Sequence, residues 1–198
     1  IGVRLVGSEM CIRDSFNIPL FGKHMVMDAT AAIIVVKELG LKKDTIEKLL
    51  QTFHNAKRRF EEQRVGNSII IDDYAHHPTE IKVTLEAVKQ KYPNKRLVVV
   101  FAPNTYSRTK DFKNEFIDAF KIADKTYLTE IDCNREKKED YPGITSHIIT
   151  DNLKGSEIIS IDTMDKLKDE VSSVVCFMGC AYVDGLIKAY KEVIEKNK

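Results

Sequence analysis

The stretch IIIDDYAHHPTEI, residues 69–81, joins an apolar run to two carboxylates, an aromatic ring and two histidines. A proline then stands where a helix could begin, because proline suits the first helical position. Open α/β sheets place their ligand sites in this order of strand, polar tip and helix. A carboxylate such as Asp73 could hold a ribose, a magnesium shell or an amine, and a histidine could take or orient a proton. We therefore expect residues 72–77 to face a ligand.

Polar residues also follow other apolar runs, in APNTYSRT, TEIDCNRE and MGCAYVDG. Because the carboxyl ends of parallel strands share one edge of a sheet, these tips could meet at a common rim. Arg108 and Arg135 could each hold a carboxylate or a phosphate in bidentate fashion. The polar groups expected at this rim are Asp72, Asp73, Tyr74, His76, His77, Asn104, Tyr106, Arg108, Glu130, Asp132, Arg135 and Glu136.

Each of these features also has a structural interpretation without chemistry. A carboxylate after a strand is often only a helix cap, and adjacent histidines can be hydrogen-bonding loop residues. Arg58 and Arg59 could belong to a solvated charge run, and Cys176 and Cys180 are typical small core residues. The sequence contains no Walker A pattern, no GxGxxG and no CxxC.

The elements that would position these residues alternate along the chain from residue 68. We expect strands at 68–72, 96–102, 125–130, 157–160 and 174–179. Helices are expected at 78–92, 109–122, 163–171 and 183–196, with a short one beginning near residue 144. This alternation predicts an α/β fold with a mainly parallel, doubly wound, Rossmann-like sheet. Upstream we expect two helices, of which the first, 23–39, is apolar on most faces and should be buried, and then a linker at 54–66.

Composition narrows the class of protein. The 198 residues are 43% hydrophobic, and 31 Lys and Arg balance 30 Asp and Glu, so nothing indicates nucleic acid or an anionic membrane as a partner. No apolar run approaches the roughly 18 residues of a membrane span. The four cysteines, Cys11, Cys133, Cys176 and Cys180, form no CxxC pair and predict reduced thiols in a cytoplasmic protein. Residues 1–15 lack periodicity and contain EMCIRDS, which resembles translated adapter sequence, so we expect a non-native or unstructured leader.

Several motifs, in this order and spacing, resemble the Mur ligase family. They are GKHMVMDATAAI, KRRFE, DDYAHHPTEI, VVFAPNTYSRTKDF, NREKKEDYPG and a closing FMG. The resemblance covers about residues 16–198, and DDYAHHPTE is its most specific part. It implies that residues 16–64 are the C-terminal remnant of a central ATP-binding domain. Residues 65–198 would then be the family's C-terminal domain.

The resemblance implies an ATP-dependent acid–amino-acid ligase of peptidoglycan precursor synthesis. Within the family, the motifs are most similar to the type that adds L-alanine to UDP-N-acetylmuramate through an acyl phosphate. ATP and Mg²⁺ are then the implied cofactors, held mainly by a central domain outside this chain, and the N-terminal and central domains of the same enzyme are implied partners. The implied catalytic residues are Arg59, Asp73 and His76. The implied nucleotide-binding residues are His24, Asp28, Arg59 and Asp73. The implied substrate-binding residues are Tyr74, His76, His77, Tyr106 and Arg108. No metal ligand is implied in this chain.

Other functions remain open on the sequence. The chain departs from the family pattern at Met25, Asp28 and Asn104 and at 179–182, and a related ligase that joins a recycled murein peptide to the same sugar nucleotide shares many motifs. A metal-dependent phosphoesterase built on the carboxylates and histidines of the 69–81 stretch is a second alternative, and a non-catalytic nucleotide-binding module is a third. Because a P-loop is absent, we expect this chain alone to be inactive.

Overall fold

The fold was analysed in a computed structural model of the chain, which describes residues 2–6, 13–180 and 183–197. Contacts divide the chain into two compact units, residues 1–55 and 56–198. This division places residues 56–64 in the second unit, whereas the sequence predicts a domain boundary between residues 64 and 65. The difference arises because the segment after residue 60 pairs with the strand that follows it.

In the first unit, strand β1 (Gly2–Val6) pairs antiparallel with β2 (Arg13–Asn17), and helices α1 (Lys23–Glu38) and α2 (Lys43–Gln51) follow. Residues 2–6 and 13–15 of the expected leader therefore lie in strands. The non-native origin of the leader stays a prediction. Cys11 lies outside the described residues. The prediction that α1 is buried is wrong, because Ile33 is its only buried described residue. Ile34 and Val35 are 48% and 58% exposed, since only one side of the helix packs on Phe16, Ile18 and Ile46.

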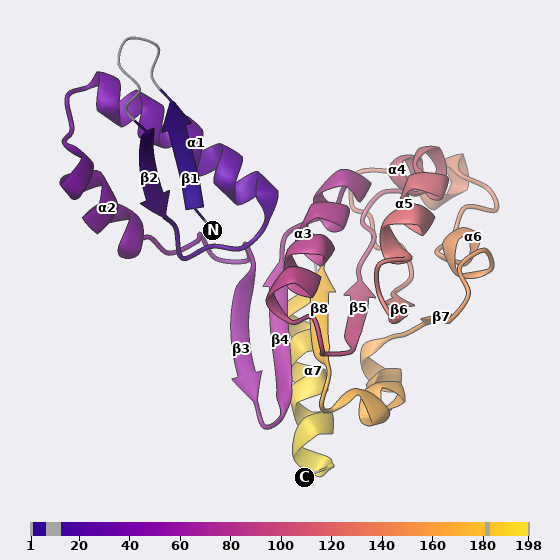
Figure 1. The fold of residues 1–198 in the computed structure, drawn as a ribbon. Coiled ribbons are helices and arrows are strands. Elements are labelled where there is room, and N and C mark those ends of the chain that lie inside the picture. The colour runs from indigo at the N-terminus through magenta and orange to yellow at the C-terminus, as the bar shows by residue number, and fades with distance from the viewer. Residues whose placement is uncertain (1, 7–12, 181–182, 198) are drawn as a thin grey trace. The chain divides into compact units, whose positions relative to one another are not determined.

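The described residues of the second unit form a six-stranded sheet, as Figure 1 shows. Its order is β3 (Glu61–Val65), β4 (Ser68–Asp73), β8 (Val174–Met178), β5 (Leu97–Phe101), β6 (Lys125–Leu128) and β7 (Ser156–Ile158). All neighbours are parallel except β3, which runs antiparallel to β4. The predicted α/β class and mainly parallel sheet are confirmed. The register aligns the ends of the three central strands at Asp73, Met178 and Phe101, so their following loops start side by side.

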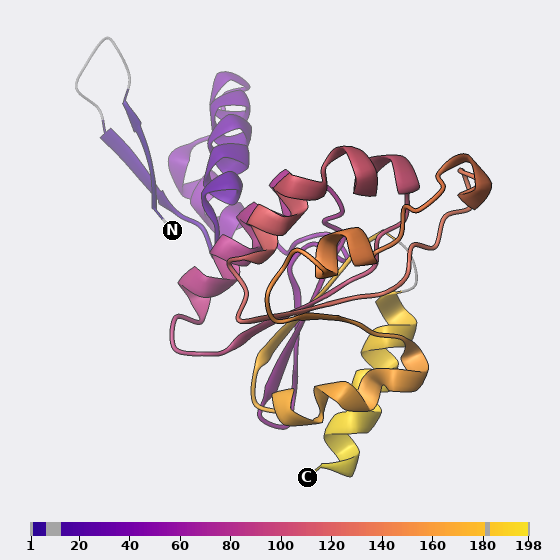
Figure 2. The same ribbon diagram turned by 90° about the vertical axis from the view of Figure 1, so that its right-hand side faces the viewer.

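Helices cover both faces of this sheet, as Figure 2 shows. The core on one face includes α3 (Pro78–Lys91), α5 (Lys113–Phe120) and α6 (His147–Thr150). The other face packs on the 3₁₀ segment η2 (Ile161–Glu170) and α7 (Val183–Lys196). Strands β4, β5 and β8 are buried at every position, as expected when helices lie on both faces of a parallel sheet.

Two sequence expectations for this unit need correction. The helix predicted at 109–122 is two helices, α4 (Tyr106–Asp111) and α5, because Phe112 between them leaves helical geometry at φ −108° and ψ 25°. The linker predicted at 54–66 contains β3, whose charged sequence EEQRV suits an edge strand. A short 3₁₀ turn, η1 (Lys138–Asp140), completes the elements. In the described residues, no helix is both long and apolar enough to cross a membrane.

Candidate functional site

The end of β4 is tied to the loop before β3 through the carboxylate of Asp73. Its Oδ1 accepts a hydrogen bond from the Ala75 N–H at 2.8 Å, and its Oδ2 accepts one from the Phe60 N–H, also at 2.8 Å. Asp73 is only 5% exposed, and this burial raises its pKa even though the two N–H donors and the charge of Arg59 act to lower it. The carboxylate therefore holds the segment around Arg59 against the tip of the strand.

Arg58 binds the ends of two strands at once. Its Nε donates to Asp72 Oδ1 at 3.2 Å, and its Nη2 and Nη1 donate to the carbonyls of Gly179 and Cys180 at 2.5 and 3.4 Å. The residue adopts a left-handed backbone with φ 57°, and its own carbonyl accepts a hydrogen bond from the Tyr74 N–H at 2.7 Å. A solvated charge run does not make these contacts, so for Arg58 that interpretation is wrong. No signal in the sequence distinguishes it from Arg59.

Tyr74 and Arg59 form the exposed part of this cluster. Two cations lie over the Tyr74 ring, with the guanidinium carbons of Arg58 and Arg59 at 5.2 and 5.6 Å from its centre. Arg59 is exposed, and in the described part of the chain its guanidinium forms no salt bridge. Its charge nevertheless acts on the carboxylates of Asp73 and Glu80. Arg59 is thus held in place and open to an anionic ligand.

His76 and His77 have different contacts. His77 is the N-cap of α3, since its Nδ1 accepts the Thr79 N–H at 3.3 Å, and its ring packs against Phe112 at 4.8 Å. His76 is half-buried, with Nδ1 at 3.0 Å from the Tyr74 carbonyl and 3.3 Å from Glu80 Oε2. Because a carbonyl can only accept, the tautomer with hydrogen on Nδ1 fits this contact. Nε2 then carries the lone pair and can accept a proton.

A second cluster surrounds the start of α4. Glu136 accepts the N–H groups of Tyr106 and Ser107 at 2.6 and 3.1 Å, and it also accepts the Ser107 hydroxyl. Burial raises the pKa of Glu136, but these hydrogen bonds and the charge of Arg108 outweigh burial and keep it below its usual value. Arg108 Nη1 donates to Asn104 Oδ1 at 3.4 Å. The carboxylate thus satisfies the first N–H groups of α4, because the side chain of Thr105 at the N-cap makes no capping hydrogen bond.

We expect Glu136→Gln to lower the free energy of unfolding by about 1 kcal/mol at pH 7, since an amide oxygen is a weaker acceptor for several donors. A carboxyl group with a depressed folded-state pKa stabilises the protein above its unfolded pKa and loses that effect as pH falls through the folded value. The difference between the variant and the parent chain should therefore shrink on acidification below about pH 4. Urea unfolding at pH 7 and pH 3 measures it. Glu139→Gln, an exposed change nearby, is the control; an equal loss there would refute the capping role.

The structure brings only some of the expected residues together. Asp73, Tyr74, His76 and Arg59 share one cluster, and Arg108 lies in the second; the contact of His77 with Phe112 links the two. Tyr106 is 8% exposed and stacks on Tyr141, so its contact with a substrate stays a prediction. That the two clusters contact one and the same ligand also stays a prediction. The remaining rim carboxylates, Glu130 and Asp132, line a separate pocket.

The expected nucleotide contacts His24 and Asp28 lie on α1 of the first unit. The Nδ1 atom of His24 is buried and, within the described residues, has no hydrogen-bond partner. A joint site with Arg59 and Asp73 stays a prediction. Nowhere in the described ranges do three His, Cys, Asp or Glu side chains group to hold a metal ion. Cys133, Cys176 and Cys180 are free thiols, and Cys176 is buried as expected.

The chain is similar in sequence to known ligases. The UDP-N-acetylmuramate–L-alanine ligase of Lactobacillus acidophilus is 43% identical over 182 residues, which are 91% of this chain and 40% of that protein. The ligase of the same name from Lactobacillus delbrueckii subsp. bulgaricus is 40% identical over 195 residues, 98% of this chain and 43% of that protein. The chain therefore spans about 40% of the length of these relatives.

Solved structures show the same fold. The UDP-N-acetylmuramate-alanine ligase of Thermotoga maritima superposes with a TM-score of 0.70 at 24% identity, covering 94% of this chain and 41% of its own. A murein peptide ligase from Psychrobacter arcticus gives 0.65 at 22% identity, covering 92% of this chain and 39% of its own. The family model described as "Mur ligase, glutamate ligase domain" matches residues 58–179, which hold β4, its polar tip and the carboxyl edge of the sheet. The chain belongs to the Mur ligase family.

Proposed function

We propose that this chain is the C-terminal part of an ATP-dependent ligase that adds L-alanine to UDP-N-acetylmuramate in peptidoglycan precursor synthesis. The observation that carries the proposal is the 43% identity, across 91% of this chain, with a protein named for that reaction. The polar tip of β4, with an exposed arginine beside a buried aspartate and a histidine, suits the chemistry. A cytoplasmic setting agrees with the free thiols of the described cysteines.

The reaction joins a carboxylate to an amine. ATP first phosphorylates the carboxylate of UDP-N-acetylmuramate, and the amine of alanine then attacks the acyl carbon, so that the amide bond forms and phosphate leaves. We assign Arg59 to the charge that develops on the transferring phosphoryl group, where a fixed cation stabilises the transition state. Asp73 positions Arg59 through the Phe60 N–H. His76 takes the proton that the attacking amine loses, through Nε2.

We also assign substrate contacts in the second unit and nucleotide contacts in the first. Arg108, with its guanidinium near the Asn104 amide oxygen, can clamp the carboxylate of a free amino acid. Tyr74 presents a 37% exposed ring beside the two arginines. We assign nucleotide contacts to His24 and Asp28, and the exposed carboxylate of Asp28 can accept a hydrogen bond from an adenine amino group. Mg²⁺ and the phosphates would be held mainly by the central domain, since no P-loop motif occurs here.

We expect the purified chain by itself to give no product, and to give product when the N-terminal and central domains of the Lactobacillus acidophilus relative are supplied separately. The assay measures phosphate release and amide formation with UDP-N-acetylmuramate and ATP, with L-alanine or a murein tripeptide as the acceptor. Preference for L-alanine supports the proposal, and preference for the tripeptide would reassign the chain to the peptide-recycling reaction. Turnover by the chain alone, or none in the mixture although both pieces are folded, would contradict it.

A further inference from the structure

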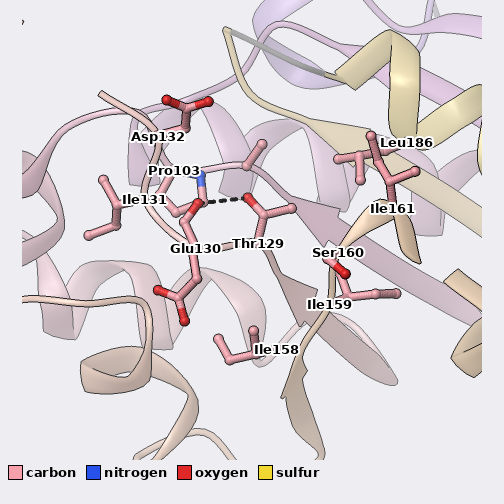
Figure 3. Close-up of a pocket in the computed structure, with 11 residues that line it drawn as sticks. Pro103, Thr129, Glu130, Ile131, Asp132, Ile158, Ile159, Ser160, Ile161 and Leu186 are labelled. Atoms are coloured by element: carbon pink, nitrogen blue, oxygen red, sulfur yellow. Dashed lines mark hydrogen bonds between the residues drawn. The ribbon is translucent and has the colours of Figure 1, made fainter. Parts of the chain in front are cut away.

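A pocket of about 360 Å³ lies at the carboxyl edge of the sheet, beyond the end of β5. Figure 3 shows its walls: the segment from Thr129 to Asp132 after β6 faces the segment from Ile158, the last residue of β7, to Ile161, and Leu186 of α7 adds a third side. Ala102 and Pro103 at the end of β5 complete it. None of the residues assigned to the ligase reaction lines this pocket. Its volume falls in the range of small-molecule sites.

The walls are mainly apolar and fixed by packing. Ile131, Ile159 and Leu186 are buried, whereas Ile161 is 54% exposed. Ile161 lies directly against α7: its Cδ1 is 3.2 Å from the position that a Cβ on Gly185 would occupy. A residue without a side chain at 185 therefore lets Ile161 close this side of the pocket. An apolar ligand could replace water against these side chains.

Hydrogen bonds hold the opposite wall in its shape. The Thr129 carbonyl accepts the hydroxyl of fully buried Ser146 at 2.6 Å. The Thr129 N–H donates to the Phe101 carbonyl at 3.0 Å, and the Asp132 N–H donates to the Pro103 carbonyl at 3.2 Å. This wall is thus anchored at one end to the last residue of β5 and at the other to the loop that follows it. The cavity is formed in advance, so a ligand would not have to order it.

The charges at the pocket have a single sign. Glu130 and Asp132 are its ionisable lining residues, and no Lys, Arg or His lines it within the described part of the chain. Figure 3 shows the Glu130 carboxylate on the side of Ile158 and the Asp132 carboxylate on the other side of the same segment. Both residues are exposed. Outside the lining, His147 Nε2 lies 3.7 Å from Glu130 Oε1, and the Lys166 ammonium donates to the Ile158 carbonyl at 2.9 Å and is paired with Glu157 at 3.7 Å. An ammonium group at the mouth would be attracted, and a carboxylate would be repelled.

We infer that this pocket binds a small monocationic amine, with its apolar body against the isoleucines and its ammonium group at Glu130. The apolar walls account for the body, and the one-signed charge selects an amine over an acid of the same shape. The inference does not depend on the proposed ligase function, because it uses other residues. It assigns a binding site to the part of the edge where the ligase reaction needs none.

The test is a titration of the full chain with 2-phenylethylamine, 2-phenylethanol and 3-phenylpropanoate, which share a ring and differ in charge. Methyl NMR shifts of the isoleucines and of Leu186 report binding at this site. We expect the amine to bind with a dissociation constant on the order of 1 mM, about threefold more tightly than the alcohol, and the acid more weakly than either. The advantage of the amine should disappear at about 1 M salt, because the carboxylates are exposed and screened.

Three variants test whether the Glu130 carboxylate supplies the charge that attracts the amine. Glu130→Gln should remove the amine's advantage over the alcohol and leave alcohol binding unchanged, whereas Ile161→Lys should abolish amine binding. Asp118→Asn, which removes another exposed carboxylate, on α5, is the matched control and should alter nothing. The inference is overturned if no ligand shifts the pocket methyls at 10 mM (about ten times the expected constant). It is also overturned if the acid binds as tightly as the amine, or if Asp118→Asn has the effect of Glu130→Gln.

Discussion

Replacing Gly179 with alanine is expected to lower the free energy of unfolding of the chain by about 3 kcal/mol. Gly179 follows the central strand β8 and has φ +139°, a conformation that residues with a side chain rarely adopt. A Cβ at this position would lie 2.6 Å from the Ala102 carbonyl oxygen, which is backbone of the neighbouring strand end. The ends of β8 and β5 would have to separate. Urea unfolding followed by far-UV circular dichroism measures the loss, because the chain has no tryptophan.

Gly155→Ala is the matched control for this experiment. Gly155 also has positive φ, +81°, but a Cβ there would meet nothing within 4 Å. Gly155→Ala should lower the free energy of unfolding by only about 1 kcal/mol, because it adds backbone strain but no steric clash. If the two variants lose the same stability, the close approach of Ala102 to Gly179 contributes nothing and the strand ends are not packed as described.

Arg58→Met is expected to cost about 2 kcal/mol of stability, whereas Arg59→Met should change it by less than about 0.5 kcal/mol. The loss of Arg58 leaves the Asp72 carboxylate, 7% exposed, and the Gly179 and Cys180 carbonyls without their donor. Burial already raises the pKa of Asp72, and Arg58 opposes that shift. The folded variant should therefore take up a proton at Asp72 more readily, and its loss should be smaller at pH 4 than at pH 8.

The same pair of variants should have the reverse order in the reconstituted ligase assay. Arg59→Met should lower turnover at least about a hundredfold, since a cation aimed at developing charge is removed. Arg58→Met should retain turnover at temperatures where the chain is folded. Equal stability losses for the two variants would contradict the assignment of Arg58 to structure. Full activity of Arg59→Met would contradict the proposed role of Arg59.

Much of the fold could be predicted from local patterns. The run of isoleucines before Asp72 and the proline at 78 placed β4 and α3, and the valines of β5 and β8 predicted strands buried on both faces. The edge strand β3 was missed, because an edge strand carries charges and lacks an apolar run. The burial of α1 was overestimated, since composition does not show how much protein is available to cover a helix.

The chemistry of the rim could be predicted only in part from the sequence. The sequence by itself determined which residue types follow each strand, and parallel topology then brought those tips to one edge. Only the tertiary structure decided which of two adjacent arginines is structural, because a left-handed backbone at Arg58 turns its guanidinium to Asp72 and the end of β8. It alone made His77 a helix cap and made Glu136 the acceptor for the start of α4. The roles of Arg58 and Glu136 depend on contacts between residues far apart in the chain, which no local pattern encodes. The cap contact of His77 with Thr79 is local, but the residue type alone did not reveal it.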